Sequence, residues 1–191
     1  MKITITEYQD SWPAMFAREK EQINNILAFL HPVIVHIGST SVPGLCAKPI
    51  IDIMIGVKNA DDLDKTIEPM RQEYTYVRMY EPDWPERRYF CRYKSDDGRT
   101  VPSLIDVGDS PTVKQGLTSL THIHTFVKDT DDWIRHIAFR DYLAAHPNER
   151  DAYCRIKQEI SKAEFDNMIS YNDAKNDFVK NMQQKALKWY K

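Results

Sequence analysis

The stretch GSTSVPGLCAKPIID, which begins at Gly38, holds the residues of this chain best suited to phosphate chemistry. It follows an apolar run, VIVHI, and a glycine at the end of a buried strand lets backbone amides approach a phosphate closely. The hydroxyls that follow, including Ser41, can donate hydrogen bonds to phosphate oxygens, and a lysine adds a positive charge. The segment therefore predicts a phosphate-binding loop. Its predicted ligands are Gly38, Ser39, Thr40 and Lys48.

Asp52 is the one charge in a second apolar run, IIDIMIGV. Burying a carboxylate is costly unless a cation or a hydrogen-bond donor compensates it. In a strand beside VIVHI, Asp52 would face the same cleft as the loop. Magnesium commonly binds through one or two carboxylates together with substrate phosphates. We therefore predict Asp52 as the catalytic residue and as a magnesium ligand, in preference to a structural carboxylate that is merely hydrogen-bonded.

The elements that position these residues follow from hydrophobic period and from breakers. A helix is expected from Trp12 to about Leu30 and a short one from Asp61 to Met70. Strands are expected at residues 33–37, 50–57, 74–79, 87–93 and 121–127, with a long loop or weak hairpin at residues 95–119. Three further helices are expected, after Thr130, at about residues 149–162 and at about residues 171–190.

Composition fits a single domain spanning residues 1–191, with a core at about 1–128 and a helical tail at about 129–191. The 26 basic and 28 acidic residues are mixed along the chain, which argues against generic nucleic-acid binding. No run is long and apolar enough for a membrane span. The three cysteines are odd in number and far apart, so we expect neither a disulfide framework nor a structural zinc site. These features predict a cytoplasmic protein.

Several blocks of the chain resemble the signature of the GrpB family, in the nucleotidyltransferase superfamily. The most specific is HIGSTSVPGLCAKPIIDIMIGV. The others are YQDSWPAMF, THIHTFV, WIRHIAFRDYLAAHPNERDAYCRIK and YNDAK, in that order. The resemblance implies an α/β (α+β) fold: a nucleotidyltransferase-like mixed sheet with an N-terminal helix and a three-helix C-terminal tail that closes one side of the cleft. It also matches Lys157, Tyr171 and Lys175 to recurring tail positions, which would contact phosphates or a base from the far wall.

One position departs from the pattern of active nucleotidyltransferases. A second metal-binding carboxylate usually follows the first by two residues, because alternate residues of a strand share a face. Here that position is Met54. Asp106 and Asp109, in the expected loop, and Glu81 are the candidates to supply the missing ligand, although nothing in their spacing requires it. The strand THIHTFV offers His122 and His124 instead of a third acid, and we expect His124 to face the substrate.

The sequence therefore leaves more than one function class open. The first is a domain that binds a nucleotide or another phosphorylated small molecule with magnesium and, if active, transfers a nucleotidyl group to a small acceptor. The second is a non-catalytic binding or regulatory module on the same fold. A weaker third is a metal-dependent hydrolase that uses His122 and His124. The aromatic cluster between Tyr74 and Phe90 is interpreted as sheet and core packing, because no basic groove accompanies it in the sequence.

Overall fold

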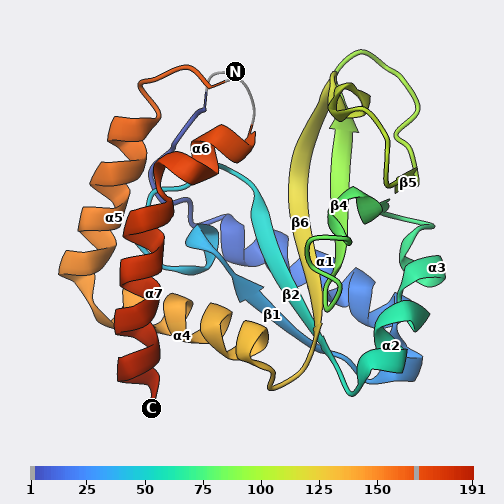
Figure 1. The fold of residues 1–191 in the computed structure, drawn as a ribbon, viewed down its shortest axis with the longest axis horizontal. Helices are drawn as coiled ribbons and strands as arrows, with labels where there is room; N and C mark the ends of the chain where they lie inside the picture. The colour runs from blue at the N-terminus through green and yellow to red at the C-terminus, as the bar shows by residue number, and fades with distance from the viewer. Residues whose placement is uncertain (1–2, 166–167) are drawn as a thin grey trace.

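A computed structural model describes residues 3–165 and 168–191 of the protein. Within these residues the strands form one six-stranded sheet in the order β1-β2-β6-β4-β3-β5 (Figure 1). β2 pairs with β6 and β3 with β5 in parallel, and the other neighbours are antiparallel. The strands are β1 (Val33–Ile37), β2 (Ile51–Val57), β3 (Thr75–Val77), β4 (Arg88–Ser95), β5 (Leu104–Ile105) and β6 (Leu117–Val127). The predicted α/β class with a mixed sheet is confirmed.

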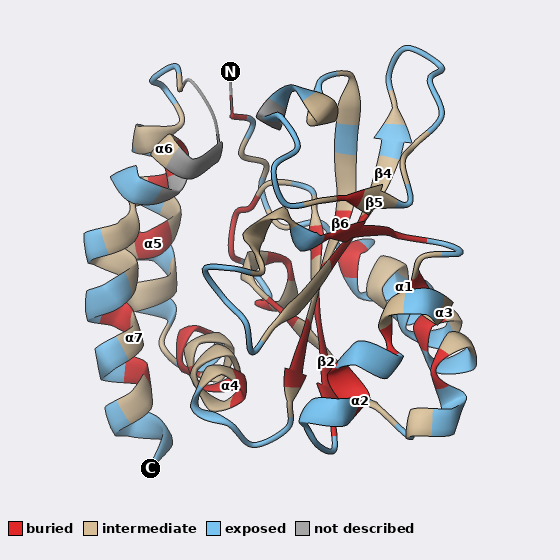
Figure 2. Ribbon diagram, turned by 45° about the vertical axis from the view of Figure 1, so that its right-hand side comes forward, coloured by how far each residue is buried: buried red, intermediate tan, exposed pale blue. Residues whose placement is uncertain are grey.

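Helices lie on both sides of this sheet (Figure 2). On one side are α1 (Trp12–Ile26), α2 (Ala60–Lys65) and α3 (Ile67–Met70). On the other are α4 (Asp131–Ala145), α5 (Pro147–Ile160), α6 (Met168–Ala174) and α7 (Asn176–Tyr190). Short 3-10 helices are η1 (Ala28–Leu30), η2 (Ser39–Ser41), η3 (Arg78–Tyr80) and η4 (Pro111–Lys114). No helix among the described residues has the length and apolar character needed to cross a membrane.

The period of two in β2 divides its residues between two environments. Ile51, Ile53 and Ile55 are fully buried in the main core, where the apolar side of α1 packs on them through residues that include Trp12 and Ile23. Pro13 suits the first turn of α1 because its missing N–H would have no helical partner there. The alternate residues of β2 therefore point to the opposite face of the sheet.

That opposite face is only partly covered by α4. Met54 of β2 packs with Phe126 of β6 and with Trp133 and Ile137 of α4 in a separate buried cluster. Asp52 lies one pleat further along β2, beyond this cover, and lines a cavity. The start of the helical tail thus decides which part of the face stays open.

Several expected boundaries are wrong in detail. The helix expected from Asp61 to Met70 is divided at Thr66, because Pro69 has no N–H to donate to the carbonyl of Lys65. The segment expected as a loop at residues 95–119 contains β5 and η4, and β6 begins within it at Leu117. Within the described residues the tail holds four helices instead of three, since Lys175 separates α6 from α7.

The structure also overturns the expectation that the cysteines stay unpaired. Cys46 and Cys154 form a disulfide, with their Cα atoms 5.4 Å apart. The bond joins the loop between β1 and β2 to α5 across 108 residues of sequence. Val42 and Leu45 of the same loop are buried against the tail. Spacing could not reveal this pair, because only the packing of the loop on the tail brings the two cysteines together.

Candidate functional site: a cavity between the sheet and the helical tail

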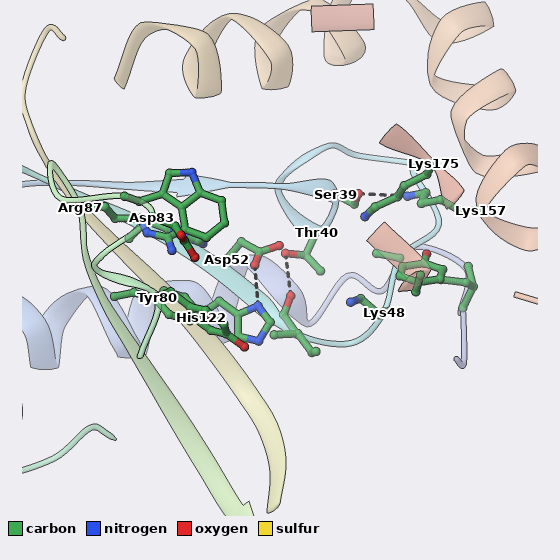
Figure 3. Close-up of a pocket in the computed structure, with 17 residues that line it drawn as sticks. Ser39, Thr40, Lys48, Asp52, Tyr80, Asp83, Arg87, His122, Lys157 and Lys175 are labelled. Carbon is green, nitrogen blue, oxygen red and sulfur yellow. Dashed lines mark hydrogen bonds and ion pairs between the residues drawn. The ribbon is translucent and has the colours of Figure 1, made fainter. Parts of the chain in front are cut away.

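A cavity of about 570 Å³ lies between the open part of the sheet face and the helical tail (Figure 3). Its lining combines residues from the loop between β1 and β2, from β2 and β6, from the segment before β4 and from the tail. Nearly all the residues predicted from separate sequence blocks meet here: Ser39, Thr40, Lys48, Asp52, His122, His124, Lys157, Tyr171 and Lys175. Residues that are more than a hundred positions apart therefore share one site.

Asp52 lies at the middle of this cavity. In the parallel pairing of β2 with β6 it stands opposite His122, and its Oδ1 lies 3.3 Å from Nδ1 of that histidine. Burial acts to raise the pKa of Asp52, but the hydrogen bond from His122 and the charges of Lys48 and Lys175 outweigh it and hold the pKa below its ordinary value. Asp52 is therefore an ionised carboxylate at neutral pH, available as a ligand for a cation.

Gly38 is required by the close approach of Asp52. Its φ of 69° and ψ of −171° place it in a region that is essentially restricted to glycine. A Cβ at this position would come within 2.8 Å of Cβ of Asp52 and closer still to its carboxylate. The structure thus gives Gly38 a part in positioning the carboxylate, and its predicted contact with phosphate stays a prediction.

The hydroxyls of the loop differ in what they can offer a ligand. Thr40 is buried, and its Oγ1 lies 3.0 Å from Nε2 of His36 and donates to the carbonyl of Ile50 at 3.4 Å. Ser39 lines the cavity, and its Oγ accepts a hydrogen bond of 3.0 Å from Nζ of Lys157. Ser39 is therefore better placed than Thr40 to meet a ligand together with the lysine.

Lys157 is the most unusual of the cationic residues, because only 3% of its surface is exposed. Its Nζ donates to Ser39 Oγ and to the carbonyl oxygen of Cys46. Burial, followed by the charge of Lys175, lowers the pKa of Lys157 to about 7, although Asp52 opposes the shift. Lysines are almost never this buried unless a charge partner is present, so the tail position is more than a solvated helix surface.

Two more lysines join it around Tyr171, which is fully buried. The Nζ atoms of Lys48 and Lys175 lie 5.1 and 5.0 Å from the centre of its ring. Burial lowers the pKa of both lysines, and that of Lys175 falls to about 8, with the charge of Lys48 contributing. Three lysines whose charged forms are disfavoured, grouped around Asp52, form a site that favours an anionic ligand.

The three candidates for the acid missing at Met54 lie elsewhere. Asp106 is held by Arg78 at 3.0 Å and by its own turn, in which Asp109 accepts from the Asp106 N–H. Glu81 accepts from the Tyr76 hydroxyl and pairs with Arg88. None of the three candidates, Asp106, Asp109 or Glu81, lines the cavity, so none of them supplies the missing ligand.

The cavity offers few ligands for a metal ion. Among the described residues no group of three or more His, Cys, Asp and Glu side chains is placed to hold a metal ion. Asp83 is the second aspartate of the cavity lining. This set fits one magnesium ion whose other ligands are substrate phosphates and water, and it does not fit a two-metal centre. It also gives no support to a metal-dependent hydrolase built on His122 and His124.

The sequence interpretation missed one wall of the cavity. Tyr80, Trp84 and Tyr89, which it assigned to core packing, line the cavity together with Arg87. We call these four residues the aromatic wall. One feature of the sequence could have indicated this wall: Arg87 lies between Trp84 and Tyr89, and an arginine among aromatic residues can make cation–π contacts at a surface. The basic groove that the sequence did not reveal is supplied by lysines from the tail.

Comparison with known proteins places this chain among its relatives. A family model described as GrpB protein matches residues 2–185. This chain belongs to the GrpB family. UPF0157 protein BH1888 of Halalkalibacterium halodurans is 35% identical over 185 residues, covering 96% of this GrpB chain and 82% of the relative. UPF0157 protein YqkA of Bacillus subtilis is 30% identical and covers 100% of the chain, which spans 49% of that longer relative.

A solved structure supports the same assignment for the fold. The crystal structure of the conserved protein GrpB from Enterococcus faecalis aligns with this GrpB protein at a TM-score of 0.76 and 31% identity. The alignment covers 98% of this chain and 99% of the other. The mixed sheet and the helical tail are therefore the architecture of a solved GrpB protein as well.

Proposed function

We propose that this GrpB protein binds a nucleotide or another phosphorylated small molecule in the cavity, with magnesium. Lys48, Lys157 and Lys175 hold the phosphate groups, and Ser39 donates a hydrogen bond to them. The observation that carries the proposal is the convergence of three lysines with lowered pKa values in a cavity that also holds Asp52.

The energetic reason lies in the cost of the buried charges. A lowered lysine pKa means that the protonated form is disfavoured in the folded protein. A phosphate group with a charge of about −1.5 to −2 at pH 7 would remove that penalty for several lysines at once. Charge-assisted hydrogen bonds to phosphate oxygens are also stronger than neutral ones. A bound anion would therefore lower the free energy of the charged lysines.

Asp52 is the residue that would hold magnesium in this proposal. The ion would neutralise charge on phosphate oxygens, while the phosphates would supply ligands that the protein lacks. The lysines around Asp52 already compensate its charge, so magnesium is expected to bind together with the phosphorylated ligand instead of before it.

Binding without chemistry is the candidate that the geometry favours over nucleotidyl transfer. The second carboxylate position is occupied by Met54, which is fully buried under α4. The described residues offer no multi-carboxylate group that would replace it. Transfer of a nucleotidyl group to a small acceptor would therefore have to proceed with a single magnesium ion. Release of pyrophosphate from ATP, CTP or UTP with a panel of acceptors separates the two candidates.

Calorimetric titration with ATP and magnesium tests the proposal through a matched pair of lysines. Lys157→Met removes a buried charge and keeps an unbranched side chain of similar length. Lys185→Met is the control, because the side chain of Lys185 on α7 is half exposed and pairs with Glu149. We expect Lys157→Met to weaken binding by about tenfold or more, because a hydrogen bond to a charged group contributes about 1.5–3 kcal/mol. Lys185→Met should leave the Kd unchanged.

Asp52→Asn is the second arm of the same titrations. It should remove the increase in affinity that magnesium gives, because the amide is a poor magnesium ligand. Failure of the wild-type protein to bind ATP, CTP, UTP and tripolyphosphate would overturn the proposal. An unchanged magnesium dependence in Asp52→Asn would overturn only the metal role.

A further inference from the structure

The aromatic wall and the lysines occupy different sides of the cavity. In Figure 3 Asp52 lies between two groups of labelled side chains. One group is Tyr80, Asp83 and Arg87, and the other is Lys48, Lys157 and Lys175. A ligand that fills the cavity therefore meets three lysines on one side and the aromatic wall, with Arg87, on the other.

Trp84 is the part of the wall that is open to a ligand. Its surface is 49% exposed, which is unusual for the largest apolar side chain. The guanidinium carbon of Arg87 lies 4.8 Å from the ring of Trp84 and 5.0 Å from that of Tyr89. Arg87 thus lies between the two rings at the cavity surface, and exposed aromatic rings with a neighbouring arginine bind planar groups such as nucleobases.

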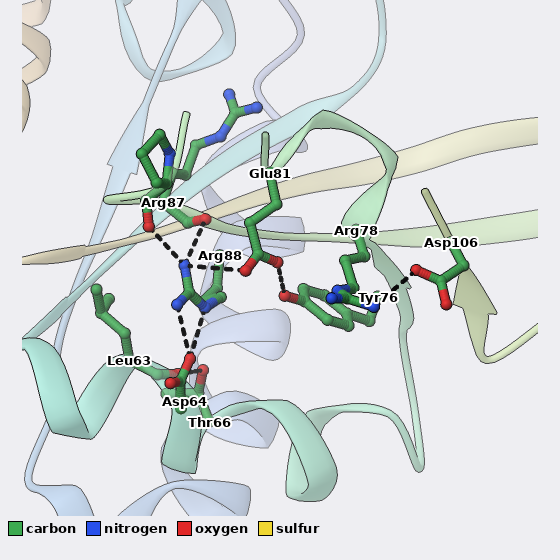
Figure 4. A network of polar contacts seen from close by, with 10 residues as sticks. Leu63, Asp64, Thr66, Tyr76, Arg78, Glu81, Arg87, Arg88 and Asp106 are labelled. Carbon is green, nitrogen blue, oxygen red and sulfur yellow. Dashed lines mark hydrogen bonds and ion pairs between the residues drawn. The ribbon is translucent and has the colours of Figure 1, made fainter. Parts of the chain in front are cut away.

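Polar contacts fix the segment that carries Trp84 (Figure 4). Glu81 accepts from the Tyr76 hydroxyl and pairs with Arg88 at 3.6 Å. Arg88 in turn pairs with Asp64 of α2 at 2.7 Å and donates to the carbonyl of Pro85 at 2.8 Å. The segment is held on both sides of Trp84, so the wall is positioned before a ligand arrives, which reduces the ordering cost of binding.

The sheet sets the separation between the two sides. Asp52 of β2 stands beside His122 of β6, and β4, which carries Tyr89, is the next strand. Two strand spacings correspond to about 10 Å. A ligand with its phosphates near Asp52 and a planar group on the wall must therefore extend across at least these two strand spacings.

We infer that the aromatic wall is a base-binding subsite, so that the ligand is a nucleotide whose base stacks on Trp84 beside Arg87 while its phosphates bind the lysines. The inference rests on the proposed function, because it presupposes the phosphate site, and it narrows the ligand class. Phosphorylated sugars and inorganic polyphosphates would fill only the lysine side. Stacking of this kind accepts any base, so purine and pyrimidine nucleotides should bind alike within a small factor.

Comparing ATP with tripolyphosphate, each with magnesium, separates the two halves of the site. The wild-type protein should bind ATP on the order of tenfold more tightly than tripolyphosphate, because only ATP has a base to stack. Trp84→Ala should bring this ratio close to one and leave the Kd for tripolyphosphate unchanged. Trp84→Phe should restore most of the preference, because phenylalanine keeps an aromatic face. Trp189→Ala removes another half-exposed tryptophan, on α7, and should change neither affinity.

The possible outcomes are distinguishable. Equal affinities of the wild-type protein for ATP and tripolyphosphate would overturn the base subsite and leave the phosphate site standing. A ratio in Trp84→Ala equal to that of the wild type would do the same. If neither probe binds, the proposed function fails and the subsite fails with it. A Trp84→Ala protein that unfolds at the same temperature as the wild type would show that its loss of affinity comes from the binding site and not from a loss of stability.

Discussion

Two halves of one sheet face differ in their cover. In the half that α4 covers, Met54 and Phe126 are buried beneath Trp133 and Ile137. In the open half, Asp52 and its strand neighbour His122 face a cavity. The same two strands, β2 and β6, build both halves. Met54 of the covered half and Asp52 of the open half are only two residues apart on β2.

This contrast shows that the position of α4 determines where the sheet face can hold a charged side chain. The helix approaches the sheet so closely that a Cβ at Gly56 would lie 2.7 Å from the ring of Trp133. A polar side chain in that half would have neither water nor a partner. Beyond the end of this contact the tail contributes lysines instead of apolar residues, and the sheet face can hold a carboxylate.

The largest effect is expected for Met54→Asp, which puts a carboxylate at the position of the second metal ligand in active nucleotidyltransferases. The side chain would be a buried, unpaired charge, so the free energy of unfolding should fall by about 3–5 kcal/mol. Met54→Leu conserves volume and should cost less than about 1.5 kcal/mol. Urea unfolding measures both. A Met54→Asp protein of wild-type stability that releases pyrophosphate from ATP would show that α4 does not exclude a second carboxylate.

A smaller effect is expected for Gly38→Ala in the open half. The substitution forces alanine into a backbone region restricted to glycine and pushes it against Asp52, so stability should fall by about 1–3 kcal/mol and affinity for ATP should fall with it. Gly98→Ala is the matched control, because Gly98 also has a positive φ but no atom lies within 4 Å of the added Cβ. Equal losses in the two variants would mean that contact with Asp52 is not what requires Gly38.

The smallest effect is the pH dependence of the open half, and its sign differs between stability and binding. The folded protein releases the proton of Lys157 near pH 7, whereas an unfolded chain keeps it until about 10.5. The unfolded state therefore binds more protons between these values, and the free energy of unfolding of the ligand-free protein should rise across this window. Affinity for ATP should fall above pH 7 to 8, as Lys157 and Lys175 lose their charge.

Thermal unfolding and calorimetry from pH 7 to 9.5 measure the two trends. Phosphate groups have a second pKa of about 6, so the ligand keeps its charge over most of this range. Lys157→Met should flatten both dependences. Stability and affinity that change in the same direction with pH would contradict the lowered pKa of Lys157 as their common cause.

The sequence alone predicted those parts of the molecule in which the local residue pattern matches the position in the fold. The apolar run VIVHI became β1, and the carboxylate inside IIDIMIGV became the cavity residue of β2. Both follow from the period of two in a strand and from the cost of burying a charge. The resemblance to GrpB proteins added the tail positions Lys157, Tyr171 and Lys175, which no local pattern distinguishes from an ordinary helix surface.

The tertiary structure decided the remaining features, because they depend on contacts between distant segments. Cys46 meets Cys154 only when the loop packs on α5, and Trp84 belongs to a cavity wall only because β4 lies beside β6. Lys157 looks solvated along the helix and is buried in the fold, which is what changes its pKa. The sequence by itself thus determined which charged and hydroxyl residues accompany the two strands at the centre of the cavity. Only the packing of the tail on the sheet determined which of them share a site, since burial and electrostatic coupling are properties of the assembled chain.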